Sequence, residues 1–245
     1  MVPPVSSERS FSRTLVVLLR DLVFIVIAAL VVSFLIKTFL IRSFYIPTES
    51  MESTLARDDR IIVSQLTPRV FPLERGDVVV FVDPGGWLSL QVGVSENDPL
   101  SRVLNGLSMV VGLSSPNDNE HLVKRVIGLP GDTVECCDEL GAMTVNGVPL
   151  SEPYLSLPEG VNKVSSEDFS VTVPKGSLWV MGDNRYNSAD SRRNTDKPGG
   201  GFVPVENVVG RAFVISWPSE RWQWLGNYPE TFEGIESRDP SRSPE

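Results

Sequence analysis

The sequence predicts a mostly β protein, in which one domain of antiparallel β-sheet follows a single N-terminal transmembrane helix. Short runs rich in Val, Ile and Phe recur along the chain and end at turn-forming residues. The 19 glycines and 19 prolines are spread along the chain, as expected for many short strands joined by turns. One long apolar segment near the N-terminus supplies the helix.

Length and charge set the domain organisation and exclude one class of partner. A chain of 245 residues can hold one large β domain with an anchor and tails. We expect disordered tails at 1–13 and 233–245, an anchor over 14–41 and a β-rich domain over 42–232. With a net charge of -9 and a pI near 4.8, no basic stripe is available, so a nucleic-acid partner is not expected.

The apolar segment runs over residues 22–41 as LVFIVIAALVVSFLIKTFLI, close to the ~20 residues that cross a bilayer. Lys37 can extend its amine toward an interface. A cleaved secretory signal is the alternative, but its apolar core is only ~7–15 residues long and ends at a small-x-small site. Leu40-Ile41-Arg42-Ser43 is no such site, so an uncleaved anchor is favoured. Basic residues flank both ends, so charge does not decide the orientation.

Strands are expected wherever β-branched runs meet turn residues. The Asn146-Gly147 pair favours a tight hairpin turn, and Pro174-Lys175-Gly176 predicts a second hairpin between the runs on either side of it. The expected strands lie within residues 59–66, 76–84, 121–127, 144–150, 169–173, 177–181 and 208–217.

Residues 85–120 differ in character from the rest of the domain. They are rich in Gly, Ser, Asn and Asp and include LSRVLNGLSMVVGL (100–113), whose apolar residues fall at helical spacing. We expect an insertion that carries a short helix. A surface excursion is favoured over a cap that covers a functional site.

Cysteine and histidine are scarce. Cys136 and Cys137 are adjacent, so they cannot staple distant strands and lack the spacing of a metal site. They are either a vicinal disulfide or, as the sequence favours, two small residues at a strand end. His121 is the single histidine, so the chain has no His/Cys cluster for zinc, and no metal or other cofactor is expected.

Ser50, in FYIPTESMESTL (44–55), is a candidate nucleophile. At 3.3–3.6 Å per residue, the nine steps from Ile41 reach at most roughly 32 Å, so Ser50 stays near the membrane. A serine hydroxyl needs a base that is neutral near the working pH. His121 and Lys124 are the two candidates for that base.

Lys124 is the better placed of the two. His121 follows an Asn/Asp/Glu-rich loop and is expected to be solvated. On a strand, Lys124 shares a face with the apolar Leu122 and Val126, and burial there lowers a lysine pKa from about 10.4 to roughly 7–8 in favourable cases. The alternative is an exposed edge-strand lysine, the usual situation, and spacing alone leaves it open.

Three stretches together resemble a known family. They are IPTESMESTL (46–55), KRVIGLPGD (124–132) and GDNRYNSADSR (182–192), in this order after an N-terminal anchor. They resemble the bacterial type I signal peptidases, membrane-bound Ser-Lys endopeptidases that remove signal peptides from exported proteins. The resemblance covers residues 44–217. It implies a single-pass protein of the cell membrane with its catalytic domain on the extracytoplasmic side, preproteins and the lipid bilayer as partners, and no cofactor.

The resemblance also implies roles at the reacting centre. Ser50 matches the nucleophile and Lys124 the general base. The backbone N–H of Ser50 and the hydroxyl of Thr48 match the pair that stabilises the oxyanion. Ser188 matches the hydroxyl that orients the lysine, and Gly182 matches a position where a side chain would crowd that lysine.

Further matches concern support and specificity. Structural ion pairs are expected between Arg125 and Asp183 and between Asp190 and Arg192. The residues that match the apolar walls of shallow pockets, which would select Ala-x-Ala by excluding larger side chains, are Phe44, Ile46 and Val123. Met51 is either a core residue or, by the resemblance, one that dips toward lipid.

The chain departs from the family pattern at a few positions. Thr48 and Glu49 stand where serine and glycine are more frequent, Ser53 stands where proline is common, and Tyr186 replaces a common acidic residue. A Gly-rich insertion, KPGGGF (197–202), precedes the last strands. Two alternatives remain: a self-cleaving Ser-Lys protease of the repressor type, which the anchor disfavours, and a membrane-tethered binding module without catalysis, which the intact Ser50, Lys124 and Ser188 disfavour.

Overall fold

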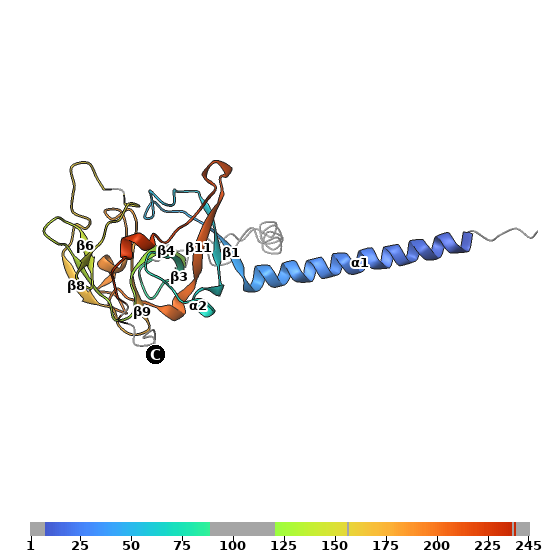
Figure 1. The fold of residues 1–245 in the computed structure, drawn as a ribbon, viewed down its shortest axis with the longest axis horizontal. Coiled ribbons are helices and arrows are strands. Elements are labelled where there is room, and N and C mark those ends of the chain that lie inside the picture. Colours follow the sequence, from blue (N-terminus) through green and yellow to red (C-terminus); the bar gives the residue numbers. More distant parts are fainter. Residues whose placement is uncertain (1–7, 89–120, 156, 237, 239–245) are drawn as a thin grey trace, which may run out of the picture. The chain divides into compact units, whose positions relative to one another are not determined.

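The computed structural model describes residues 8–88, 121–155, 157–236 and 238, and the chain divides into two units, residues 1–41 and 42–245 (Figure 1). The first unit is the helix α1, Glu8–Phe39. Its segment Val16–Phe34 is 19 residues long and, by length and composition, able to cross a membrane. The helix begins at Glu8, so the prediction of disorder over 1–13 is wrong for residues 8–13, where the apolar helix extends into polar sequence.

The second unit is built from two antiparallel sheets, as the fold class predicted. The larger, eight-stranded sheet has the order β1-β2-β11-β3-β4-β9-β10, with β12 paired to β11, and the smaller has the order β7-β6-β5-β8. In Figure 1, β6 and β8 of the smaller sheet lie together at one end of this unit.

The bounds of the strands follow the β-branched runs closely. The larger sheet contains β1 Ile41–Tyr45, β2 Arg60–Ser64, β3 Val78–Val82, β4 His121–Gly128, β9 Ser177–Met181, β10 Val203–Pro204, β11 Val208–Trp217 and β12 Gln223–Trp224. The smaller contains β5 Thr133–Cys136, β6 Met143–Val145, β7 Val148–Pro149 and β8 Phe169–Thr172. A short helix α2, Leu66–Arg69, and 3-10 turns at Ser191–Asn194, Val205–Asn207, Ser219–Arg221 and Pro229–Phe232 connect them.

Strand β3 shows why the larger sheet is apolar on both faces. Val78 and Val80 pack into one core cluster, whereas Val79 and Phe81 pack into another on the opposite face. A strand covered on both sides needs a continuous apolar run, which is what VVVFV supplies. Met51 belongs to the first cluster and is 1% exposed, so it is a core residue and the interpretation of a side chain dipping into lipid is wrong.

One of the two predicted hairpins is confirmed and the other is wrong. Asn146 and Gly147 both have positive φ, and they connect β6 to β7 with Val145 opposite Val148. By contrast, β8 pairs with β5 in the smaller sheet and β9 pairs with β4 and β10 in the larger one. The turn before β9 therefore carries the chain between two sheets, because long-range pairing overrode the local signal.

Two further predictions concern the edges of the domain. Ile235 is buried in the core, and Arg75 Nη1 donates to its carbonyl oxygen at 3.2 Å, so the tail predicted from residue 233 is ordered through Glu236. Of the insertion predicted at 85–120, residues 89–120 lie outside the described residues. Trp87, just before them, packs its ring 5.8 Å from that of Phe81.

Candidate active site

Ser50 lies in a tight turn that follows β1. The backbone N–H of Glu52 donates to Glu49 O at 3.0 Å, and that of Leu55 donates to Met51 O at 2.7 Å. Met51 and Leu55 are both buried in the core. The backbone that carries the serine is therefore anchored by hydrogen bonds and by two apolar side chains.

Lys124 reaches this serine from β4. It stands opposite Val79 of β3, and only 3% of it is exposed. Its Nζ lies 2.7 Å from Ser50 Oγ and 2.8 Å from the carbonyl oxygen of Val123, and it donates to both. Two residues 74 positions apart in the sequence thus meet in direct hydrogen-bonding contact.

Burial changes the acid–base behaviour of this amine. It lowers the pKa of Lys124 from 10.5 to about 8, because the charged form loses its hydration. Asp190 and Asp183 act in the opposite direction but do not cancel the effect. Close to pH 8 a large share of the amines is therefore uncharged and able to accept a proton.

Thr48 and Asn184 surround the serine. Thr48 Oγ1 lies 3.3 Å from Ser50 Oγ, so a second hydroxyl lies beside that of the candidate nucleophile. The backbone N–H of Asn184 donates to Ser50 O at 3.2 Å, and its Nδ2 donates to Glu49 O at the same distance. The third motif therefore holds the backbone on both sides of the Glu49–Ser50 peptide bond. The sequence motif did not predict these hydrogen bonds from Asn184.

Ser188 and Gly182 lie against the serine turn from the other side. A Cβ at Gly182 would lie 2.3 Å from Ser188 Oγ and 2.4 Å from Ser50 O, so only glycine allows this approach. The atoms that a side chain would crowd first are thus those of Ser188 and Ser50. Ser188 Oγ is buried without a hydrogen-bond partner among the described residues, so the expected bond to Lys124 is not formed in this structure.

Both expected ion pairs are present and buried. Arg125 Nη2 lies 2.6 Å from Asp183 Oδ2, and Arg192 Nη2 lies 2.8 Å from Asp190 Oδ2. Burial, the largest single influence, opposes ionisation of Asp190, but the hydrogen bonds and charge of Arg192 together with the N–H of Gly182 outweigh it, and the pKa of Asp190 is lowered. Each of these two carboxylates is therefore paired with an arginine of its own.

The signal peptidase, peptidase S26 family matches residues 19–217 of the chain. The chain belongs to this family. A probable signal peptidase I of Mycobacterium leprae is 42% identical over 206 residues, which are 74% of this chain and 70% of that protein. Signal peptidase I of Mycobacterium tuberculosis is 43% identical over 224 residues, 83% and 74% of the two chains. Signal peptidase I of Leptolyngbya laminosa is 37% identical over 185 residues, 76% and 73% of the two.

The predicted family and enzyme class, a serine endopeptidase of the signal peptidase I type, are thereby confirmed. The three residues matched to the pocket walls of the family lie together. Phe44 and Ile46 are buried in one core cluster, and Val123 packs against it. His121 stands at the start of β4 with its ring 5.2 Å from that of Phe44, whereas Lys124 is the residue that contacts Ser50.

A third buried ion pair was missed from the sequence. Arg185 of the third motif pairs with Glu152 at 2.5 Å, and both side chains are almost fully buried. Glu152 also accepts a hydrogen bond from the Tyr154 hydroxyl at 2.7 Å. Glu152 lies 33 residues from its partner and in no motif, so only the fold identifies it.

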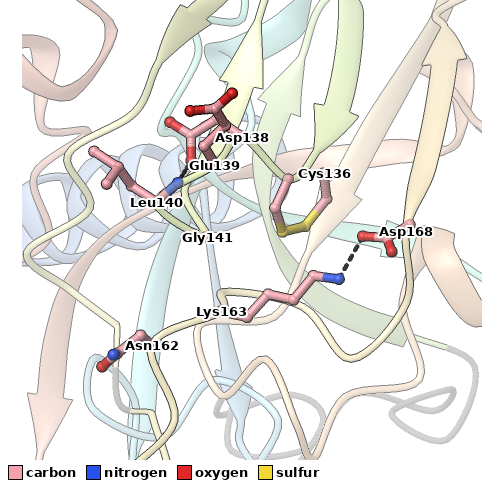
Figure 2. Close-up of a pocket in the computed structure, with 9 residues that line it drawn as sticks. Cys136, Asp138, Glu139, Leu140, Gly141, Asn162, Lys163 and Asp168 are labelled. Atoms are coloured by element: carbon pink, nitrogen blue, oxygen red, sulfur yellow. Dashed lines mark hydrogen bonds and ion pairs between the residues drawn. A yellow bond between two sulfur atoms is a disulfide. The ribbon is translucent and has the colours of Figure 1, made fainter.

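A hollow of about 730 Å³ lies away from these motifs, on the smaller sheet (Figure 2). Cys136 and Cys137 are joined there by a disulfide, so the favoured interpretation of two unbonded small residues is wrong. Their sulfur atoms and an Asp168 carboxylate oxygen lie within 4.8 Å of one another. The sulfurs are bonded to each other and Lys163 Nζ holds the carboxylate at 2.5 Å, so these three groups do not form an available ligand set.

Proposed function

We propose that Ser50 and Lys124 form the nucleophile and general base with which this family member removes signal peptides from exported preproteins. The observation that carries the proposal is the 2.7 Å contact between Lys124 Nζ and Ser50 Oγ, at a position where burial lowers the pKa of the amine to about 8. A neutral amine at hydrogen-bonding distance is what a serine hydroxyl requires for activation.

The first half of the reaction forms an acyl-enzyme. Uncharged Lys124 takes the hydroxyl proton of Ser50 as Oγ attacks the scissile carbonyl carbon. The resulting oxyanion is stabilised by the Ser50 N–H and the Thr48 hydroxyl, whose oxygen is 3.3 Å from Ser50 Oγ. Lys124 then gives its proton to the leaving amine as the peptide C–N bond breaks. One such oxyanion donor typically contributes about 10²–10³ in rate.

The second half regenerates the enzyme. Lys124, neutral again, takes a proton from water, and the hydroxide attacks the ester carbonyl. Collapse of this intermediate breaks the bond to Ser50 Oγ, which recovers its proton from Lys124, and the signal peptide leaves with a new carboxylate. One amine thus transfers every proton, consistent with its direct contact with Ser50 Oγ.

The residues that match the pocket walls of the family support the proposed substrate class. Phe44, Ile46 and Val123 are apolar and closely packed, which favours small residues at the cut and two places upstream. Such a preference corresponds to Ala-x-Ala at the end of a signal peptide. Preproteins that carry this sequence are the proposed substrates.

The same proposal places the β domain at the extracytoplasmic surface of the cell membrane, with α1 as its single span. Ser50 follows Ile41 by nine residues, and α1 contains a segment able to cross a bilayer. Trp217, Trp222 and Trp224 are each more than half exposed. Exposed tryptophan is typical of residues that lie at a membrane–water interface.

Incubation of the full-length protein in detergent with a purified preprotein tests this function. Wild type is expected to release the mature protein by cutting after a small-x-small sequence, whereas Ser50→Ala and Lys124→Ala bind the preprotein without cutting it. Binding without cleavage by wild type would favour the non-catalytic module instead. For the sidedness, protease added to spheroplasts is expected to degrade the β domain, and full protection would contradict the placement.

A further inference from the structure

We propose that Thr54 is a positioning residue for this reaction: its hydroxyl fixes the turn that carries Ser50 against the strand that carries Lys124. The inference rests on the Ser50–Lys124 mechanism proposed above. Thr54 does not touch the reacting atoms, and it acts through the Arg125–Asp183 ion pair.

The hydroxyl of Thr54 makes two hydrogen bonds in a buried place. Thr54 is 7% exposed, and its Oγ1 donates to Asp183 Oδ2 at 2.5 Å. The same oxygen accepts a hydrogen bond from Arg125 Nη2 at 3.2 Å. One side chain of the first motif therefore contacts a residue of the second and a residue of the third.

The position of Thr54 is transmitted to Ser50 through a short, rigid turn. The backbone N–H of Thr54 donates to Met51 O at 3.1 Å, and that of Leu55 donates to the same oxygen. Met51 and Leu55 are buried, so this turn cannot pivot without disturbing the core. A displacement of the Thr54 side chain should therefore also displace Ser50, four residues earlier in the chain.

The opposite side of the contact is equally fixed. Arg125 directly follows Lys124 on β4, and its Nη1 donates to Gly76 O at 2.7 Å. Its guanidinium lies 4.0 Å from the ring centroid of Tyr154, and it binds Asp183 through two hydrogen bonds of 2.8 and 2.6 Å. Arg125 and Asp183 thus form a rigid support. The Thr54 hydroxyl attaches the turn that carries Ser50 to this support.

Other contacts join the same segments, so the expected effect is graded. The N–H and Nδ2 groups of Asn184 donate to Ser50 O and Glu49 O, each at 3.2 Å. These bonds are longer than the 2.5 Å bond of Thr54, and Glu49 is exposed to solvent. Loss of the Thr54 hydroxyl should loosen the turn and leave the domain folded.

Thr54→Val removes the hydroxyl and keeps the shape of the side chain. We expect kcat for preprotein cleavage to fall about 10²-fold, the scale of loss for a misplaced reacting group, with KM unchanged because the pocket walls are intact. Thr54→Ser restores the hydroxyl and should recover kcat to within a few-fold of wild type.

Thr231→Val is the matched control. Thr231 is also buried, at 4% exposed, and its Oγ1 donates to Ser151 O at 2.8 Å, away from the three motifs. This variant also loses a buried threonine hydroxyl, but only one hydrogen bond to a neutral carbonyl, so its unfolding midpoint should fall by less than that of Thr54→Val, which loses two hydrogen bonds to charged groups. Its kcat should stay at the wild-type value.

The pH profile separates positioning from a general loss of stability. In Thr54→Val the loosened contact admits water to Lys124, so the acid limb of kcat should move to higher pH than in wild type. The inference is overturned if Thr54→Val keeps wild-type kcat, if Thr54→Ser is equally impaired, if Thr231→Val loses the same activity, or if the acid limb does not move. Failure of wild type itself to cleave would contradict the proposed function, and this inference with it.

Discussion

Lys124 and Lys163 lie in opposite surroundings within one domain. The Lys124 amine is buried on the larger sheet, where it contacts a hydroxyl and a carbonyl oxygen, neither of which carries a charge. The Lys163 side chain is 41% exposed beside the smaller sheet, and its amine lies 2.5 Å from the carboxylate of Asp168 (Figure 2). The Lys124 amine has lost its hydration without gaining a counter-ion. The Lys163 amine keeps its hydration and has a counter-ion in Asp168.

The difference shows how the fold lowers the pKa of the amine that we propose as the general base. Asp183 and Asp190 both act on Lys124, yet each is bound by an arginine, Arg125 and Arg192 respectively. The arginines neutralise much of the attraction that would otherwise hold a proton on the lysine. The two structural ion pairs therefore do more than fix the third motif, because they leave the amine without a carboxylate partner of its own.

Replacing each lysine by methionine tests this comparison, and the largest expected effect is on kcat. Lys124→Met removes the proposed general base, so kcat for preprotein cleavage should fall by about 10²–10⁴, the range that such a group contributes. Lys163→Met removes only a surface ion pair and should leave kcat within about twofold of wild type. Comparable losses in the two folded variants, measured under identical conditions, would mean that burial of the amine is not what matters.

The pH dependence of cleavage is the next effect in size. Only uncharged Lys124 accepts the serine proton, and its pKa is lowered to about 8 by burial. Below that pH the neutral fraction falls about tenfold per unit, so log kcat should rise with unit slope and level off above about pH 8. Lys163→Met should give the same profile. A rate that is flat between about pH 6 and 9 would exclude Lys124 as the base.

Much of the β domain could be predicted because local sequence determines it. The run VVGRAFVISW forms β11 over Val208–Trp217, the range expected from its β-branched content. The alternation of side chains along β4 placed Lys124 between the apolar Leu122 and Val126 but left open whether it is buried, and the structure shows that it is 3% exposed.

The remaining features depend on partners that no local pattern specifies. The turn before β9 favours a hairpin, but β8 finds its partner in β5 and β9 in β4. Likewise, the partners of Thr54 lie 71 and 129 positions away, and a buried hydroxyl looks the same in sequence as an exposed one. Motifs identify which residues react, whereas the three-dimensional pairing identifies which residues hold them.

The smallest expected effect concerns stability rather than activity. The pKa of Lys124 is about 8 in the folded protein, against an ordinary 10.5, so between these values the unfolded chain binds more protons and stability rises with pH. Below about pH 8 both states are protonated, and the burial penalty of about 3 kcal/mol is present in full. Lys124→Met carries no such penalty and should be more stable than wild type at pH 7, by an amount that shrinks toward pH 10.5.

Urea unfolding of the full-length proteins in detergent, followed by tryptophan fluorescence at pH 7 and pH 10, measures this difference. Lys163→Met is the control, because a half-exposed ion pair contributes only about 0–1 kcal/mol, and its difference from wild type should not depend on pH in this window. If Lys124→Met is less stable than wild type at pH 7, the buried amine is not destabilising. Its lowered pKa then needs a cause other than lost hydration.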